Sequence, residues 1–221
     1  MKSVLKYVLL YFGILITIIL SILTTILLTQ SKTLNKIGLV VKSEGVFSTE
    51  LELLKLENFE NKYCDFLDDE KAQYISERCK EFKVDTDLVV AILQKENPSL
   101  KEDAVSKMND NGSVDLGLFQ LNDQTLYKWD FLKNWWKEDI MGEFNASNWK
   151  HNSYIAIKYI QDLTKTFGED NVYYIAAAYN AGCTKAWNTY IGNKNGAQIP
   201  QSTREDYVPS VLSNYKIWKN K

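Results

Sequence analysis

The sequence has few of the residues that metal and thiol sites require. Its 221 residues include one histidine, His151, and three cysteines, Cys64, Cys79 and Cys183, with no CxxC pair among them. HExxH enzymes and other sites that need two imidazoles are therefore excluded, and a structural zinc site lacks ligands at the usual spacing. We expect no metal and no cofactor.

The chain also lacks an excess of charge of one sign. It carries 26 basic and 28 acidic side chains, so a large basic face for nucleic acid is not expected, and nucleic acid is excluded as a partner. The remaining classes are an enzyme that uses a carboxylate, thiol or hydroxyl group, and a binding module.

The N-terminal segment differs in composition from the rest. The run Tyr7–Leu28 contains no charged residue, and as a helix it would span roughly 33 Å, the thickness of a bilayer core. A cleaved signal peptide is the alternative, but its apolar region is normally about 7–15 residues long, and Leu27–Ser31 lacks a small-x-small cleavage site. The sequence thus predicts an uncleaved membrane anchor over residues 1–28. Lysines flank both ends of the run, so charge alone does not set its orientation.

The remainder divides into a stalk and a helical domain. Residues 29–68 lack a sustained period apart from an imperfect helical stripe over Leu51–Phe59, and they are interpreted as a linker with a short helix. From residue 69 to 221 the pattern is a series of helices with few strand signals, which predicts a mainly α domain.

One predicted helix, over residues 85–96, ends in a carboxylate on its apolar face. Glu96 follows Ile92 and Val89 at helical spacing, and Asn97 and Pro98 end the helix. Burial and the negative end of the helix dipole both disfavour the anion, so the pattern predicts a raised pKa and a general acid. A glutamate that reaches solvent or pairs with a lysine is the alternative.

Two further segments contain polar residues in apolar surroundings. Gly117 permits a close backbone approach, and Gln120 stands as an uncharged donor and acceptor after an apolar pair. Asp170 can cap a helix that ends at Gly182, and Tyr179 would project its hydroxyl from that helix toward a buried carboxyl. A core tyrosine with a satisfied hydroxyl is the alternative for Tyr179.

Taken in order, these segments resemble the lysozyme-like lytic transglycosylase family, which includes the soluble lytic transglycosylase and goose-type lysozyme-like domains. The resemblance covers roughly Val84–Tyr215. It is carried by Ile92–Pro98, Gly112–Asn122 and Ala177–Gly182, and by the weaker matches Asn152 with Tyr159-Ile160, Ile199-Pro200, Ser202–Arg204 and Tyr207-Val208.

The resemblance implies a lysozyme-like fold and the cleavage of peptidoglycan strands. It implies that Glu96 is the sole acid and base, and that Tyr179 orients it or hydrogen-bonds to it. It also implies that the glycan is bound by residues of the two later motifs, namely Gln120, Asn180, Gly117 and Phe119. Two departures from the family pattern are the absence of a serine after Glu96, where Asn97-Pro98 stands, and Ser202 in place of an acidic residue.

The reaction implied by the resemblance forms a 1,6-anhydro-muramic product. A hydrolytic muramidase is the alternative, with Asp110 or Asp115 holding water. Two different classes of protein also stay open: a catalytically silent glycan-binding scaffold of a wall-spanning machine, and a thiol peptidase built from Cys183 and His151.

The location of peptidoglycan orients the predicted anchor. Since this substrate lies outside the cytoplasmic membrane, we expect a single-pass protein whose residues 29–221 are extracytoplasmic. In an exported domain Cys64 and Cys79 are expected to form a disulfide, with buried free thiols as the alternative. Three tryptophans between the last two motifs, Trp129, Trp135 and Trp136, are expected to pack an insert onto the core, with glycan stacking as the alternative.

Overall fold

The computed structural model describes residues 60–128, 132, 135, 136 and 142–221. All of them belong to the second of two units into which the chain divides, residues 59–221. The predicted anchor at 1–28 and residues 29–59 of the predicted stalk lie outside the described residues. Within the described part, no helix is both long enough and apolar enough to cross a membrane.

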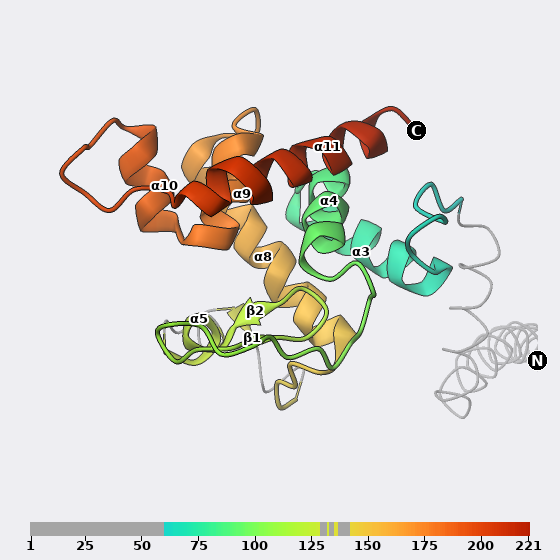
Figure 1. Cartoon of the computed structure of the whole chain (residues 1–221). Coiled ribbons are helices and arrows are strands. Elements are labelled where there is room, and N and C mark those ends of the chain that lie inside the picture. Colours follow the sequence, from blue (N-terminus) through green and yellow to red (C-terminus); the bar gives the residue numbers. More distant parts are fainter. Residues whose placement is uncertain (1–59, 129–131, 133–134, 137–141) are drawn as a thin grey trace, which may run out of the picture. The chain divides into compact units, whose positions relative to one another are not determined.

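The described unit is mainly helical, as the sequence predicts (Figure 1). Its only strands in the described residues are two antiparallel pieces, β1 (Asp115–Leu116) and β2 (Leu121–Asn122), in which Asp115 pairs with Asn122. The helices are α3 (Asp69–Phe82), α4 (Thr86–Glu96), α5 (Asp123–Lys128), α8 (Trp149–Phe167), α9 (Val172–Ala181), α10 (Cys183–Tyr190) and α11 (Val208–Lys219), with a π-helical turn, η1 (Thr203–Tyr207), before α11.

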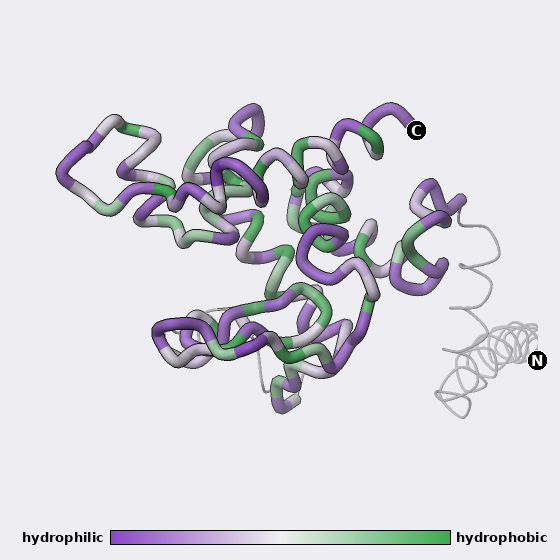
Figure 2. Tube along the Cα trace, in the orientation of Figure 1, coloured by the Kyte–Doolittle hydropathy of each residue, from purple (hydrophilic) through white to green (hydrophobic). Residues whose placement is uncertain are grey.

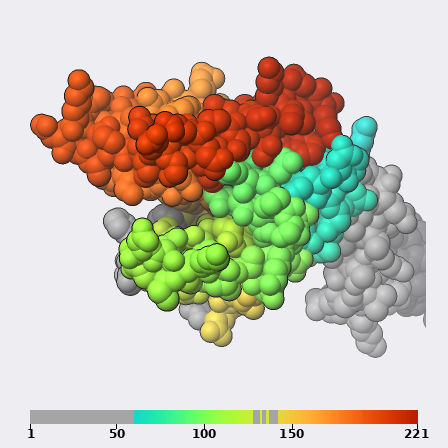
Figure 3. Space-filling model, viewed as in Figure 1, coloured from blue at the N-terminus to red at the C-terminus, as the bar shows by residue number. Residues whose placement is uncertain are grey.

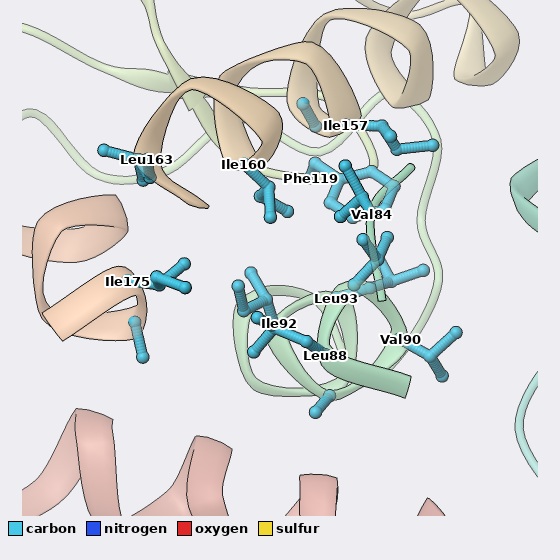
Figure 4. Packing of buried hydrophobic residues seen from close by; sticks show 14 of the residues in the cluster. Val84, Leu88, Val90, Ile92, Leu93, Phe119, Ile157, Ile160, Leu163 and Ile175 are labelled. Carbon is cyan, nitrogen blue, oxygen red and sulfur yellow. The ribbon is translucent and has the colours of Figure 1, made fainter. Parts of the chain in front are cut away.

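Helix α4 is the centre of the core. The Asp85 side chain caps it by accepting a hydrogen bond from the Asp87 backbone, and every residue from Asp87 to Leu93 is buried. Figure 4 shows the apolar side chains of α4 facing those of α8 and α9, and Figure 2 shows the hydrophobic residues along α4. Helix α11 packs along α4 as well. A helix covered on all sides holds its last residue, Glu96, in a fixed place.

The packed unit begins before residue 69, where the sequence predicts the domain to start. Tyr63 and Leu67 belong to the hydrophobic core, and the Tyr63 hydroxyl donates to Asp87 Oδ1 at 2.7 Å. The last residues of the predicted stalk are therefore part of the domain, because their apolar side chains cover the start of α4.

Two local predictions are wrong. Cys64 is exposed, Cys79 is buried, and both are free thiols, so the expected disulfide is not formed. The N-cap of α9 is Asn171 and no side chain caps it, so Asp170 does not have the predicted role.

The tryptophan insert is described in part. Trp136 is buried against Phe144 and His151, as expected for packing onto the core, and Trp135 is half-buried beside Tyr159. Trp129 lies outside the described residues.

Candidate active site

A cleft of about 540 Å³ lies between the segment around β1 and β2 and the helices α9 and α10. Figure 3 shows the hollow between the green 100–125 region and the orange helices above it. The predicted residues that line it are Glu96, Gln120, Tyr179 and Asn180, joined by a polar set from the loop before β1 and by Lys185 from α10. Residues from three separate motifs thus meet at one concave site.

Glu96 lies at the C-terminal end of α4 and lines the cleft. Burial raises the pKa of its carboxyl to about 7, the hydrogen bond from Tyr207 opposes that rise, and the neighbouring Asp115 adds to it. The sequence prediction of a glutamate with a raised pKa therefore agrees with the structure. Burial is the main cause of the shift.

Tyr207 is the partner of Glu96. Its hydroxyl donates to Glu96 Oε1 at 2.5 Å, and the ring is buried. This contact occupies one carboxyl oxygen and leaves Oε2 to carry the proton of the neutral acid. Tyr207 belongs to a motif that carries the family resemblance, but no role for it was predicted from the sequence.

The π-helical turn η1 explains how Tyr207 reaches Glu96. The turn is attached to α9 by a hydrogen bond from Thr203 Oγ1 to Asn180 Oδ1 (2.7 Å), and to α4 by an ion pair between Lys95 and Asp206 (2.9 Å). Single π-helical turns are rare and often occur at functional sites, but no sequence period identifies them. The contacts with α9 and α4 thus hold the turn, and with it Tyr207, in place beside Glu96.

Tyr179 does not hydrogen-bond to Glu96, so the hydrogen bond that the resemblance offers as one of two possibilities is wrong. Its hydroxyl donates to the backbone carbonyl of Phe119 at 2.9 Å, and its ring packs near that of Tyr159. Burial and the nearby Glu96 carboxyl raise the pKa of the Tyr179 phenol well above its ordinary value, so the hydroxyl stays a donor. Tyr179 lines the cleft and holds the β1–β2 connection.

Gly117 and Phe119 do not line the cleft, contrary to expectation. Gly117 has φ +73°, and a Cβ placed there would lie 2.2 Å from the Ala146 carbonyl oxygen and 2.3 Å from Asn152 Nδ2. Phe119 is fully buried in the core. Gly117 is therefore needed so that the backbone of the connection can approach Asn152 of α8, and Phe119 packs its side chain into the core cluster that includes α8.

Asn152 of α8 is the residue that the connection packs against. It is fully buried, its Oδ1 accepts from the Phe119 N–H at 2.7 Å, and its Nδ2 donates to the Leu116 carbonyl at 2.9 Å. Asn152 therefore sets the position of the hairpin that carries Gln120.

Gln120 and Asn180 belong to different motifs, and both line the same cleft. Gln120 has φ +48°, and its Nε2 donates to the Gly117 carbonyl at 2.8 Å, which leaves its amide oxygen as an acceptor. Asn180 is exposed. Both amides can offer hydrogen-bond groups to a neutral polar ligand.

A second carboxylate, Asp115, also lines the cleft. Its Oδ1 accepts from Asn122 Nδ2 at 2.8 Å, and its Oδ2 accepts from Asn109 Nδ2 at 3.3 Å. These two amides fix the carboxylate beside Glu96, whose pKa it helps to raise. Asp110 lines the cleft as well.

Asn97 stands where the family pattern has a serine after Glu96. Its Nδ2 donates to the carbonyls of Lys101 (2.8 Å) and Leu118 (3.2 Å), and its Oδ1 accepts from the Lys101 backbone N–H (3.2 Å). A buried asparagine thus joins the end of α4 to the β1–β2 connection and closes the loop that Pro98 begins.

A thiol peptidase has no support in the site. The His151 ring contacts that of Trp136 at a tilt, and its Nδ1 accepts from the Asn145 N–H. No hydrogen bond within the described residues joins His151 to Cys183. Burial and the nearby Asp162 raise the pKa of the Cys183 thiol, which disfavours the nucleophilic thiolate. Among the residues with described positions, no group of three or more His, Cys, Asp or Glu could hold a metal ion.

Comparisons with known proteins point to one family. A family model described as the transglycosylase SLT domain matches residues 73–201. A search of curated proteins found no match.

Eighteen chains of solved structures match, and two are similar over 67% of this chain. One is the lytic transglycosylase Slt of Pseudomonas aeruginosa, as an inactive glutamate-to-glutamine mutant, with 20% identity and a TM-score of 0.50. The other is the 70 kDa soluble lytic transglycosylase of Escherichia coli, with 22% identity and a TM-score of 0.53. The match covers 24% of each of those chains, and at these identities it shows a common fold.

Proposed function

The chain belongs to the transglycosylase SLT domain family, and from that premise we propose that it is a peptidoglycan lytic transglycosylase. The single observation that carries the proposal is Glu96, a carboxyl held in the cleft with its pKa raised to about 7 and one oxygen fixed by Tyr207. An acid with such a pKa holds its proton near neutrality and can still release it.

The proposed reaction uses Glu96 twice. The neutral carboxyl protonates the oxygen between N-acetylmuramic acid and N-acetylglucosamine, the bond from that oxygen to muramyl C1 breaks, and the substrate acetamide stabilises the cation at C1. The Glu96 carboxylate then takes the proton of the muramyl C6 hydroxyl as that oxygen attacks C1. The 1,6-anhydro product forms without water, and Glu96 regains its proton.

Gln120, Tyr179 and Asn180 would bind the sugar in this reaction. Their amide and hydroxyl groups suit a neutral ligand rich in hydroxyls and acetamides, and they come from two sides of the cleft. No cofactor enters the proposal.

A hydrolytic muramidase is the second candidate, and Asp115 is the observation that favours it. A glycosidase with two carboxylates uses the second one as a nucleophile or to activate water. Asp115 is fixed in the cleft near Glu96 and could serve in this way.

Product analysis separates the two candidates. Sacculi digested by the full chain should give anhydro-muramic ends by mass spectrometry, and reducing-end muramic acid as the main product would favour the muramidase. Glu96→Gln should abolish both products, as a glutamate-to-glutamine change accompanies inactivity in the Pseudomonas aeruginosa relative. Full wall-degrading activity in this variant would contradict the role of Glu96.

We further propose that Tyr7–Leu28 anchors the protein in the cytoplasmic membrane with residues 29–221 on the outer side. The length of the uncharged run and the location of peptidoglycan support this placement. Protease added to intact spheroplasts should digest the domain, and a protected C-terminal end would contradict the orientation. A scaffold role in wall-spanning machinery would require a partner protein, which co-purification from membranes would identify.

A further inference from the structure

Lys185 is a cleft residue to which the proposed reaction assigns no role. It lies on α10, in the part of the lining that continues from Asn180 through Gly182. Among the described residues that line the cleft, it is the only lysine or arginine. Its side chain is partly exposed, and no carboxylate of the described residues forms an ion pair with it.

The aspartates of the described cleft lining lie on the side opposite Lys185. Asp110 and Asp115 come from the region of β1, whereas Lys185 comes from α10 on the other side of the hollow (Figures 1 and 3). Ionised acids on the β1 side repel an anionic ligand group, so the Lys185 side is where such a group is favoured.

The charges of peptidoglycan are not on its sugars. The N-acetyl sugars are neutral once the lactyl group of muramic acid is joined to a peptide, and the carboxylates belong to that peptide. A cation at one end of a cleft that binds the glycan can therefore pair with a carboxylate of that peptide.

We propose that Lys185 binds a carboxylate of the peptide attached to muramic acid and makes the enzyme selective for peptide-bearing strands. This inference rests on the proposed function, because it assumes that the glycan occupies the cleft. Lys185 acts as a specificity residue and takes no part in bond cleavage.

The test measures binding in full-length Glu96→Gln protein, in neutral detergent, so that ligands are not cleaved. Three soluble ligands are compared: strands with free peptide carboxylates, the same strands with the carboxylates converted to amides, and strands freed of peptide by an amidase and then treated to convert the exposed lactyl carboxylates to amides. Lys185→Ala should weaken binding of the first ligand about 3- to 10-fold and leave the other two unchanged. Lys185→Arg should retain most of the binding, and the loss should shrink at high salt.

Lys194→Ala is the matched control, because Lys194 is exposed and does not line the cleft. Equal losses for all three ligands, or no loss for any of them, would overturn the role of Lys185. Cleavage by the chain with its native Glu96 is measured in parallel. If that chain binds strands and yields no cleaved product, the proposed function fails while the three-ligand comparison still decides the role of Lys185. A chain that binds none of the ligands contradicts both.

Discussion

Replacing Glu96 by glutamine should stabilise the fold, and the gain should depend on pH. The folded protein binds the Glu96 proton more tightly than the unfolded chain, because burial raises the pKa of this carboxyl from 4.5 to about 7. Below pH 4.5 the carboxyl is neutral in both states. As pH rises from 4.5 to 7, the unfolded state loses its proton first, so the wild-type protein loses stability, and above pH 7 the loss levels off.

The size of the effect follows from the same pKa. Each tenfold difference in proton affinity is equivalent to about 1.4 kcal/mol, so the full penalty approaches about 3 kcal/mol at pH 8. Glutamine has the same shape, carries no charge and can accept the Tyr207 hydroxyl through its amide oxygen. The free energy of unfolding of Glu96→Gln should therefore exceed that of the wild type by an amount that grows by about 2 to 3 kcal/mol between pH 5 and pH 8.

Denaturant titrations of both proteins at pH 5, 6, 7 and 8 measure this difference. Glu169→Gln is the control, since Glu169 is exposed, and its difference from wild type should stay nearly constant over the same range. A difference between wild type and Glu96→Gln that does not change with pH would refute the claim that the folded protein holds this proton.

Three other changes test the structure around Glu96. Tyr207→Phe removes the hydrogen bond that lowers the pKa of Glu96, so the alkaline limb of kcat/KM should move to higher pH and kcat should fall about tenfold; an unchanged profile would contradict the contact. Gly117→Ala should lower the free energy of unfolding by more than about 3 kcal/mol, because the added Cβ would lie within 2.3 Å of Ala146 and Asn152. Gly112 also has a positive φ (+77°) but open space around it, so Gly112→Ala should lower the free energy of unfolding by only about 1 kcal/mol. Thermal unfolding compares the two variants. Asn152→Ala leaves buried backbone groups unpaired and should lower the free energy of unfolding by about 3 kcal/mol in the same assay. A variant as stable as the wild type would contradict this role of Asn152.

Local periodicity was enough to predict α4 and the buried carboxyl at its end. The apolar stripe, the capping Asp85 and the Asn97-Pro98 stop all act within one helix, so a window of the sequence contains the whole signal. The raised pKa follows because a carboxyl on a buried face is desolvated wherever the partner helices lie.

The contacts of Glu96 could not be predicted in the same way. Tyr207 lies 111 residues away along the chain, and it reaches the carboxyl through a π-helical turn that has no sequence period. Tyr179 has the same residue type and also lies close to Glu96, so composition alone could not decide which phenol donates. The choice depends on the Phe119 carbonyl, which takes the Tyr179 hydroxyl.

The surroundings of Glu96 suit the two roles that the proposed reaction gives it, first acid and then base. Burial and the fixed Asp115 carboxylate favour the neutral form, which holds the proton until it is donated, while the Tyr207 hydroxyl favours the anion, which forms on donation. Burial alone would raise the pKa of the carboxyl further and make it a weaker acid, and a weaker acid protonates the leaving oxygen less effectively. With a pKa of about 7, the carboxyl can donate a proton in the first step and accept one in the second step near neutral pH. The proposed reaction returns the proton to Glu96 within one turnover, so one side chain must be stable enough both as the neutral acid and as the anion. Burial stabilises the neutral acid, and the Tyr207 hydrogen bond stabilises the anion.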